Sequence, residues 1–433
     1  MILRTLITCL TCKNPITARI NIGHEVEQPV NFPCPDCGTE IRLNLLLDAP
    51  PRDLLLDAPP RVKIRWDENC EQGNTEGKVI NIGAGFIVSK DMLHQDFIFP
   101  SFFAPRPTNE ELEKIRNQKF KDAAIAGGLL PYAEKHWKIL KSALQFHNTN
   151  QLEKMEERLK SYWGDSNESA LQFHNTNQLE KMEERLKSYW GDSNETDKSL
   201  EYALFTFLMR LMEPSTETWM SPLIAVLEEA RSLNRSEYDK LVSHYNLDLK
   251  QNRFESYSEI ISDYFRAYGE FNQTLIYVRR QIELPKNSIA TSSDFDKTKM
   301  FYGSAFEVLG SNLDIIAALN NILCGRAFDK MEKMDLKKFR TIDKAGRTNC
   351  FIKNNNLSGL VNEYDSTIRN ASHHRWFKLS NNRQEITYRS GGTGAIQKMS
   401  YAEYLVKCNK ITMQLISLMC LELILMNYSG SKL

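Results

Sequence analysis

The sequence has no excess of charge of either sign, because 55 Lys and Arg balance 55 Asp and Glu over 433 residues. A neutral chain has no overall field that would draw it onto nucleic acid, so any polyanion binding must depend on a local patch. One such patch exists: the stretch from Lys330 to Lys410 holds 16 Lys and Arg against 7 Asp and Glu. It is either a solvated basic face or a surface that handles phosphate.

Long apolar runs are also missing. The beginning, MILRTLITCLTC, is interrupted too soon for a signal peptide, so we expect a cytoplasmic protein. Near the other end, ITMQLISLMCLELILM contains Gln414 and Glu422 and is shorter than the ~20 residues that a membrane span requires. We therefore predict a buried helix there and no contact with a membrane.

Glycine-rich phosphate loops are absent as well. The segment NIGAGF has neither the GxGxxG nor the Walker spacing, and no helical pattern follows it directly. Glycines that serve turns explain the segment, and no catalytic cofactor is predicted.

Four of the nine cysteines form a pattern: Cys9 and Cys12 are followed, after 21 residues, by Cys34 and Cys37. Each CxxC pair lies on a turn that directs two thiolates to one point, and two such turns complete a tetrahedral zinc site. Four protein ligands leave no position for water, so this zinc should be structural. Alternating TARINI and EIRLNL supply short strands, and residues 1–47 are predicted to form a zinc ribbon. The remaining cysteines are expected to be reduced, small hydrophobic residues: Cys70, Cys324, Cys350, Cys408 and Cys420.

Two segments are repeated without change. LLLDAPPR occurs at 45–52 and 54–61, and a 27-residue segment beginning SALQFHNTNQ occurs at 142–168 and 169–195. Solenoid repeats drift in sequence and need three or more copies, so these pairs indicate a recent duplication or an error in the recorded sequence. The long copy predicts a short amphipathic helix from Leu152, Met155, Leu159 and Tyr162, ended by WGDSNE.

The chain as a whole is predicted to be multidomain and mainly α-helical. The segments RVKIRW, GKVINIG, GFIVSK and DFIFPSFF predict a small β unit at 61–105. A helical region follows at 106–250, with PTNEELEKIRNQKF, LEYALFTFLMRLM and SPLIAVLEEARSL among its helices. Residues 251–433 predict a four-helix bundle with an inserted β-hairpin built from WFKL, EITYR and AIQKM. Its first two helices are each expected to be long and continuous, one around YSEIISDYFRAYGEFNQTLIYVRRQI and the next over FYGSAFEVLGSNLDIIAALNNILCGRAFDKM. Ser400 and Glu403 form a capping box for its last helix.

The third helix of this bundle carries polar residues that can do chemistry. A helix over 357–374 is predicted because Leu360, Val361, Tyr364, Ile368 and Ala371 repeat at helical spacing. Arg369 lies four residues before His373, and Asn370 lies four before His374, so all four residues can share one surface. The simplest alternative is a surface ion pair between Asp365 and Arg369 beside solvated histidines.

Arg369, Asn370 and His374 match R-N-x3-H, a form of the R-x4-6-H motif. In this motif the chain resembles the HEPN (higher eukaryotes and prokaryotes nucleotide-binding) superfamily. The expected hairpin and final apolar helix also resemble members found in abortive infection and antiviral defence. The resemblance covers about residues 256–426. It implies an HEPN-like four-helix bundle that forms a homodimer or larger homo-oligomer.

In catalytic members of this family the bundle is a metal-independent RNA endonuclease, and the resemblance implies such an activity in a defence or toxin effector. Histidine can move a proton at neutral pH, and arginine can hold a phosphate and its transition-state charge. Attack by the ribose 2′-hydroxyl would leave a 2′,3′-cyclic phosphate. The expected catalytic residues are Arg369 and His374, with Asn370 orienting the histidine and His373 auxiliary or structural.

Other interpretations remain at this point. Some family members add an acidic or polar residue from an earlier helix, for which Asp314 and Asn312 are candidates. A non-catalytic HEPN-like module for dimerisation or nucleotide binding is the main alternative, with the ribbon recruiting a regulatory partner or phage trigger. A DNA-contacting ribbon is disfavoured by the acidic residues near it: Glu25, Glu27, Asp36 and Glu40.

Overall fold

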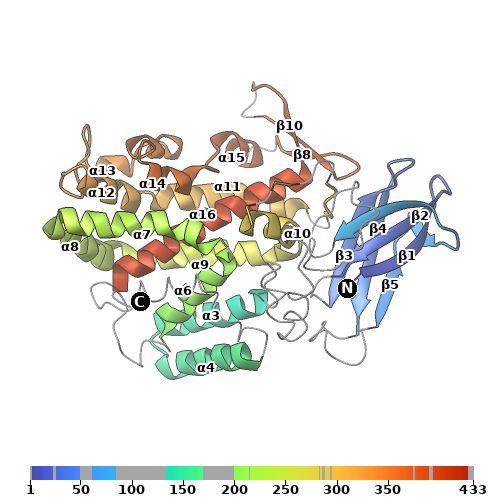
Figure 1. The fold of residues 1–433 in the computed structure, drawn as a ribbon, viewed down its shortest axis with the longest axis horizontal. Coiled ribbons are helices and arrows are strands. Elements are labelled where there is room, and N and C mark those ends of the chain that lie inside the picture. Colours follow the sequence, from blue (N-terminus) through green and yellow to red (C-terminus); the bar gives the residue numbers. More distant parts are fainter. Residues whose placement is uncertain are drawn as a thin grey trace, which may run out of the picture. The chain divides into compact units, whose positions relative to one another are not determined.

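The computed structural model describes residues 2–22, 26–48, 61–83, 133–168, 199–213, 215–281, 283–284, 288–292, 295–373, 376–389 and 394–427. Figure 1 shows a β-rich N-terminal part and helices through most of the remaining described chain. The chain divides into two compact units. The first contains residues 1–132, 266–300 and 370–409, and the second contains residues 133–265, 301–369 and 410–433.

Seven strands form two sheets in the first unit. Their bounds are β1 Ile2–Cys9, β2 Pro15–Asn21, β3 Glu27–Pro33, β4 Glu40–Leu47, β5 Val62–Trp66, β6 Cys70–Gln72 and β7 Lys78–Gly83. One sheet has the order β6-β1-β2-β7 and the other β3-β4-β5. The pair β2 and β7 is parallel, and the other pairs are antiparallel.

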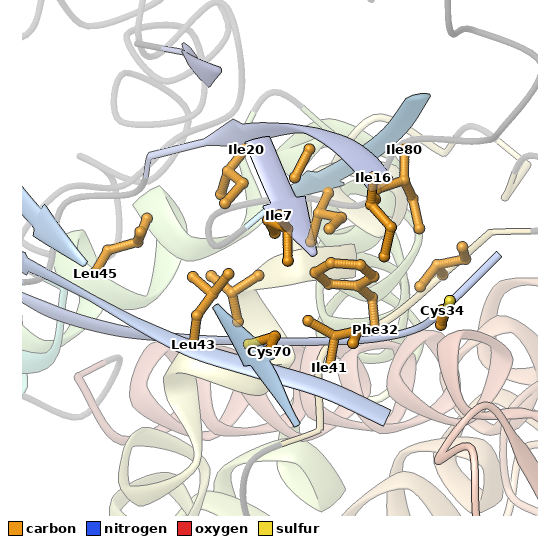
Figure 2. Close-up of a cluster of buried hydrophobic side chains, with 14 of the residues drawn as sticks. Ile7, Ile16, Ile20, Phe32, Cys34, Ile41, Leu43, Leu45, Cys70 and Ile80 are labelled. Carbon is orange, nitrogen blue, oxygen red and sulfur yellow. The ribbon is translucent and has the colours of Figure 1, made fainter. Parts of the chain in front are cut away.

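The core of these sheets follows from alternation along the strands. In β4, Ile41, Leu43, Leu45 and Leu47 are buried while Arg42 is exposed, as a period of two requires when one face meets a core. The buried side chains of both sheets form one cluster that includes Ile7, Ile16, Phe32 and Ile80 (Figure 2). Apolar burial of this extent stabilises the sheets.

The two N-terminal stretches predicted as separate units share their sheets. Strand β5 pairs with β4, while β6 and β7 extend the edges of β1 and β2. The physical reason is that the edge strand of a sheet has backbone N–H and C=O groups without hydrogen-bond partners, and the later strands supply these partners. Strands RVKIRW and GKVINIG form as predicted. The segments GFIVSK, DFIFPSFF and PTNEELEKIRNQKF and the second LLLDAPP lie outside the described residues.

Later parts of the chain complete the first unit. They include α10 Tyr268–Arg279 and a second three-stranded sheet of order β10-β9-β8, with β8 Lys378–Leu379, β9 Glu385–Tyr388 and β10 Gln397–Ser400. Ile289 belongs to the core of the N-terminal sheets, and the Thr291 hydroxyl donates to the Asn31 carbonyl at 3.3 Å. Arg383 forms an ion pair with Glu40 at 3.2 Å. The N-terminal sheets and the later hairpin are therefore parts of one folded unit.

The second unit is helical. Its elements, some of which continue into the first unit, are α3 Ala133–Asn148, α4 Leu152–Glu168, α6 Leu200–Met212, α7 Thr216–Leu233, α8 Arg235–His244, the π-helical turn η3 Tyr245–Leu249, α9 Lys250–Arg266, α11 Phe295–Asn312, α12 Asp314–Leu323, α13 Leu336–Phe339, the 3-10 turns η4 Lys344–Cys350 and η5 Gly359–Val361, α14 Asn355–Ser358, α15 Ser366–His373 and α16 Tyr401–Asn427. The predicted helix LEYALFTFLMRLM is α6, and SPLIAVLEEARSL lies within α7.

The first long copy of the duplication spans two helices. It begins inside α3, turns at Asn150 with a φ of 55°, and continues along α4. Leu159 and Tyr162 are buried as the amphipathic pattern predicts, whereas Leu152 is 49% exposed. The helix also continues through WGDSNE, which was expected to end it. The second copy at 169–195 lies outside the described residues.

Two helices predicted as continuous are interrupted. The segment around YSEIISDYFRAYGEF divides at Ala267 into α9 and α10, and FYGSAFEVLGSNLDII divides at Leu313 into α11 and α12. Close to the second break, the Ser311 hydroxyl donates to the Glu307 carbonyl at 2.8 Å, a contact that tends to bend helices. A four-helix bundle is therefore not evident from the element order alone.

The C-terminal helix forms as predicted. In the capping box the Ser400 N–H donates to the Glu403 carboxylate at 2.7 Å, and the Glu403 N–H donates to the Ser400 hydroxyl at 3.1 Å. Among the described residues, α16 is the one helix long and apolar enough to cross a membrane, but 94% of its apolar window is buried inside the protein. Burial by protein is typical of a core helix.

Candidate functional site

Helix α15 carries the predicted motif and is shorter than expected. The chain leaves the 3-10 turn η5 after Val361, and α15 begins only at Ser366. Asp365 explains this start, because its carboxylate accepts from the Thr367 N–H at 2.7 Å, as an N-terminal capping group does. Ile368 and Ala371 are fully buried, which fixes the rotation of the helix about its axis. Arg369, Asn370 and His373 are half-buried on α15, and His374 lies outside the described residues.

Arg369 is held by a carboxylate from another helix. Its Nε donates to Oε1 of Glu307 on α11 at 2.6 Å, and its Nη2 contacts the same oxygen. The predicted alternative, an ion pair with Asp365, does not form, because the Asp365 carboxylate is used to begin the helix. Two donors on one acceptor give the guanidinium a defined orientation.

Lys344 makes this a cluster of three charges. Its ammonium pairs with Oε2 of Glu307 and also donates to the Glu307 carbonyl at 3.2 Å. Burial alone would raise the pKa of the Glu307 carboxyl, but Lys344 and Arg369 outweigh it and lower that pKa below its ordinary value. The cluster therefore has one carboxylate between two cations at neutral pH. Glu307 was not singled out in the sequence, since no spacing rule relates it to Arg369.

Asp314, the acidic candidate from the sequence, belongs to a different cluster. It accepts from Arg340 Nε at 2.6 Å and pairs with Arg253, which also contacts Glu422 at 3.3 Å. Burial would raise the pKa of Asp314, yet the two guanidinium groups lower it. Asp314, one of the two candidates from the sequence, is thus held by Arg253 and Arg340. Asn312, the other candidate, is buried, and no hydrogen bond joins it to the motif residues in the described part of the chain.

The buried carboxyl of Glu422 ends this second cluster. The hydroxyls of Tyr245 and Tyr257 each donate to it at 3.0 Å. Burial raises the pKa of Glu422 to about 7, and Arg253 opposes that rise. Outward from Asp314, Arg340 contacts His244 at 3.0 Å, and His244 contacts Asp248 at 2.6 Å. Charged groups thus run from the core to the π-helical turn at the surface.

The four patterned cysteines come together as the spacing predicts. Their sulfurs all lie within 4.8 Å of one another. The Sγ atoms of Cys9 and Cys37 are 3.7 Å apart, as are those of Cys12 and Cys34. A tetrahedron with metal–sulfur bonds of about 2.3 Å has edges of about 3.8 Å, so these distances fit a metal ion of that size. These residues could hold such an ion.

Matching turns build this cluster. Lys13 follows Cys12 with a φ of 61°, and Gly38 follows Cys37 with a φ of 74°. In each turn a backbone N–H returns to the first cysteine: Lys13 donates to the Cys9 carbonyl at 2.8 Å, and Gly38 to the Cys34 carbonyl at 3.0 Å. Burial raises the pKa of Cys34 to about 12, whereas a hydrogen bond with the Thr39 hydroxyl lowers the pKa of Cys37 to about 6. A bound cation would favour the thiolate at all four positions.

Cys70 is a fifth thiol near this cluster, and it has a different partner. It lies opposite Cys9 in the pairing of β1 and β6, and its thiol donates to the Arg42 carbonyl at 3.1 Å. Of the remaining cysteines, Cys408 and Cys420 are buried, Cys350 is half-buried and Cys324 is exposed.

Comparisons of the chain with protein-family models, with curated proteins and with solved structures found no match.

Proposed function

We propose that the chain is a metal-independent RNA endonuclease of the HEPN type and acts as a defence or toxin effector. The observation that carries the proposal is the orientation of Arg369 by Glu307 beside Asn370 and His373 on α15. Catalysis of phosphoryl transfer without a metal depends on a charged group that is already in position. A guanidinium fixed by a carboxylate meets that requirement.

The chemistry follows from the residue types. The ribose 2′-oxygen attacks the adjacent phosphorus, the bond from phosphorus to the 5′-oxygen breaks, and a 2′,3′-cyclic phosphate and a 5′-hydroxyl remain. One imidazole takes the proton of the 2′-hydroxyl, and another protonates the leaving 5′-oxygen. Arg369 stabilises the charge that gathers on the phosphate oxygens. DNA lacks the 2′-hydroxyl and is not cut.

His374 is assigned the proton transfer, Asn370 orients it from one turn earlier, and His373 is auxiliary. One motif supplies one such histidine, whereas acid and base are both needed. Two chains in a homodimer would supply them. In this proposal Glu307 is a positioning residue, because it acts on the phosphate through Arg369.

The four cysteines hold a structural zinc ion in this proposal. With four protein ligands the ion keeps no open position, so it takes no part in RNA cleavage. It fixes the turns at the ends of β1 and β3, which belong to the first unit.

RNA cleavage by the purified full chain tests the proposal. Single-stranded RNA or transfer RNA should be cut in buffer with EDTA, the products should end in cyclic phosphate, and the same sequence as DNA should survive. Arg369→Ala and His374→Ala should each lower the rate at least about a hundredfold. Arg235→Ala removes an exposed arginine that is also paired, to Asp239 at 2.9 Å, and should cut normally. Equal activity of the Arg369 and control variants would exclude the mechanism.

The ion pair of Arg369 also favours a second function, a non-catalytic HEPN-like dimerisation or nucleotide-binding module. A paired arginine can be purely structural. The variant Glu307→Gln distinguishes the two functions, because it leaves the Arg369 guanidinium in place but replaces its carboxylate partner with an uncharged amide. The nuclease predicts a slower rate with a nearly unchanged KM. The non-catalytic module predicts no cleavage by any form of the chain, and only a lower melting temperature.

A further inference from the structure

The small sheet that follows the motif has one exposed face of unusual composition. Pairing places Lys378, Thr387 and Lys398 in one row across β8, β9 and β10. Both lysines are exposed. The opposite face carries Leu379, Ile386 and Met399, of which Ile386 is fully buried. The sheet is therefore amphipathic, with both lysines on the outer face. Its strands β8 and β10 are labelled in Figure 1.

Beyond the strand ends, extending the register of β8 and β9 by two residues aligns Trp376 with Arg389 on the outer face. The guanidinium carbon of Arg389 lies 3.5 Å from the centre of the Trp376 ring, as this alignment requires. Phe377 and Tyr388 alternate with these residues along the chain and are buried on the inner face, with ring centres 5.7 Å apart. Phe377 also packs against Tyr404 at 4.9 Å. The inner aromatic residues thus anchor the sheet and leave the tryptophan on the outer face.

We propose that this outer face binds single-stranded RNA, with the Trp376–Arg389 pair stacking a base and Lys378 and Lys398 contacting the backbone. The proposal rests on the proposed function in choosing RNA as the polyanion. Flat aromatic and guanidinium groups between cations are the chemistry by which proteins hold single strands without reading their sequence. The charge of the face is complementary to phosphate. Glu385, which pairs with Ser400 in the next row, is the single acidic residue among the described positions of the face.

Glu385 does not block the face. It pairs with Lys398 at 2.8 Å, but both side chains are well exposed, 46% and 63% respectively. An exposed pair of this kind contributes little to stability, so a phosphate can replace the carboxylate at little cost. Ile396, 68% exposed beyond the start of β10, adds an apolar contact next to the stacked pair.

Fluorescence anisotropy with a labelled uridine oligomer of about 12 nucleotides measures this binding. The measurements use the full chain carrying Arg369→Ala, so that the probe stays intact. Lys378→Gln with Lys398→Gln should weaken binding and lower the slope of log K against log salt by about 1.4. The matched control is Lys337→Gln with Lys338→Gln, which removes two exposed lysines from α13. It should leave the affinity and the slope unchanged.

Stacking has its own test. Trp376→Ala should weaken binding about five- to hundredfold, whereas Trp376→Phe should keep most of the affinity. Melting temperatures of all variants show whether the sheet is still folded.

The surface is excluded if the probe does not bind at low salt, or if the α13 control loses as much affinity as the lysine pair. A chain that binds RNA on this face but never cuts it would refute the proposed nuclease activity and support the proposed RNA-binding face. If the chain with Lys378→Gln and Lys398→Gln cuts RNA with an unchanged KM, the proposed nuclease activity is supported and the proposed RNA-binding face is refuted.

Discussion

At the scale of single residues, pairing partners decide what each charge can do. Arg369 and Arg253 are both paired arginines of the same chain, yet their surroundings differ. Arg369 is half-buried and pairs with Glu307, while Arg253 is buried between Asp314 and Glu422. A buried charge is stable only when it keeps its partners or is neutralised. The contribution of the Arg253 cluster to folding stability therefore depends on the protonation of its carboxyl groups. The Arg369 cluster keeps contact with solvent, as the proposed role of Arg369 in holding a phosphate requires.

Glu422 makes stability depend on pH in a defined direction. Its pKa is raised to about 7, so the folded chain holds this proton to a higher pH than the unfolded chain does. The resulting stability is fully present below about pH 4.5 and is lost as the pH rises through about 7. Relative to Glu422→Gln, which stays neutral, the wild-type chain should lose up to about 3 kcal/mol of unfolding free energy between pH 4.5 and 8.

Urea unfolding at a series of pH values measures that difference. Glu255→Gln is the control, because Glu255 is an exposed residue of the same helix as Arg253. Its difference from wild type should vary by less than about 0.5 kcal/mol over the range. A flat difference for Glu422→Gln would mean that Arg253 keeps the carboxyl ionised throughout.

At the scale of elements, turn geometry and sheet pairing act together in the N-terminal part. The two CxxC turns are local, and each needs a left-handed residue after its second cysteine, Lys13 or Gly38. The sheets that carry the turns are held by pairing between distant strands and by the core in Figure 2. Metal binding should therefore fix the turns more than it forms the sheets.

Cysteine substitutions test this division. Cys34→Ser removes a predicted ligand, so the purified chain should contain no zinc, while wild type contains one ion per chain. Cys70→Ser should keep its zinc, since the Cys70 thiol donates to the Arg42 carbonyl. Elemental analysis gives the zinc content. Circular dichroism shows whether the β structure survives, which we expect in both variants. Loss of zinc from the Cys70 variant would contradict the assignment of ligands.

At the scale of the whole molecule, the exact duplication offers a simple experiment. Both copies end in the same residues, so deleting 169–195 joins Glu168 to Thr196 and recreates the junction found at Glu195. The shortened chain keeps α3 and α4 whole, including the buried Trp137 and Tyr162. We expect its melting temperature to stay within about 2 °C of the full chain. A larger fall would show that the second copy contributes its own packing.

The extent to which sequence predicted structure differs between the two candidate sites. The zinc cysteines were predictable because their geometry is set within each four-residue turn. The buried face of the motif helix, which contains Ile368 and Ala371, was predictable from the apolar spacing. The start of the helix was not predictable, because Asp365 serves as its N-terminal cap and interrupts the apolar periodicity. The partner of Arg369 could not be predicted, since Glu307 lies 62 positions away and only packing of α11 brings it near.

The sequence by itself determined the local features of this protein: the cysteine turns, the capping box at Ser400, the alternating strands and the order of motif, hairpin and apolar helix. These depend on neighbours within a few residues, where chain geometry leaves few choices. Only the tertiary structure decided which strands share a sheet, where long helices break, and that Glu307 rather than Asp314 holds Arg369. Such pairings depend on how segments that are distant in the sequence pack together. Burial alone favours many apolar arrangements, and contacts between charged groups then favour one of them.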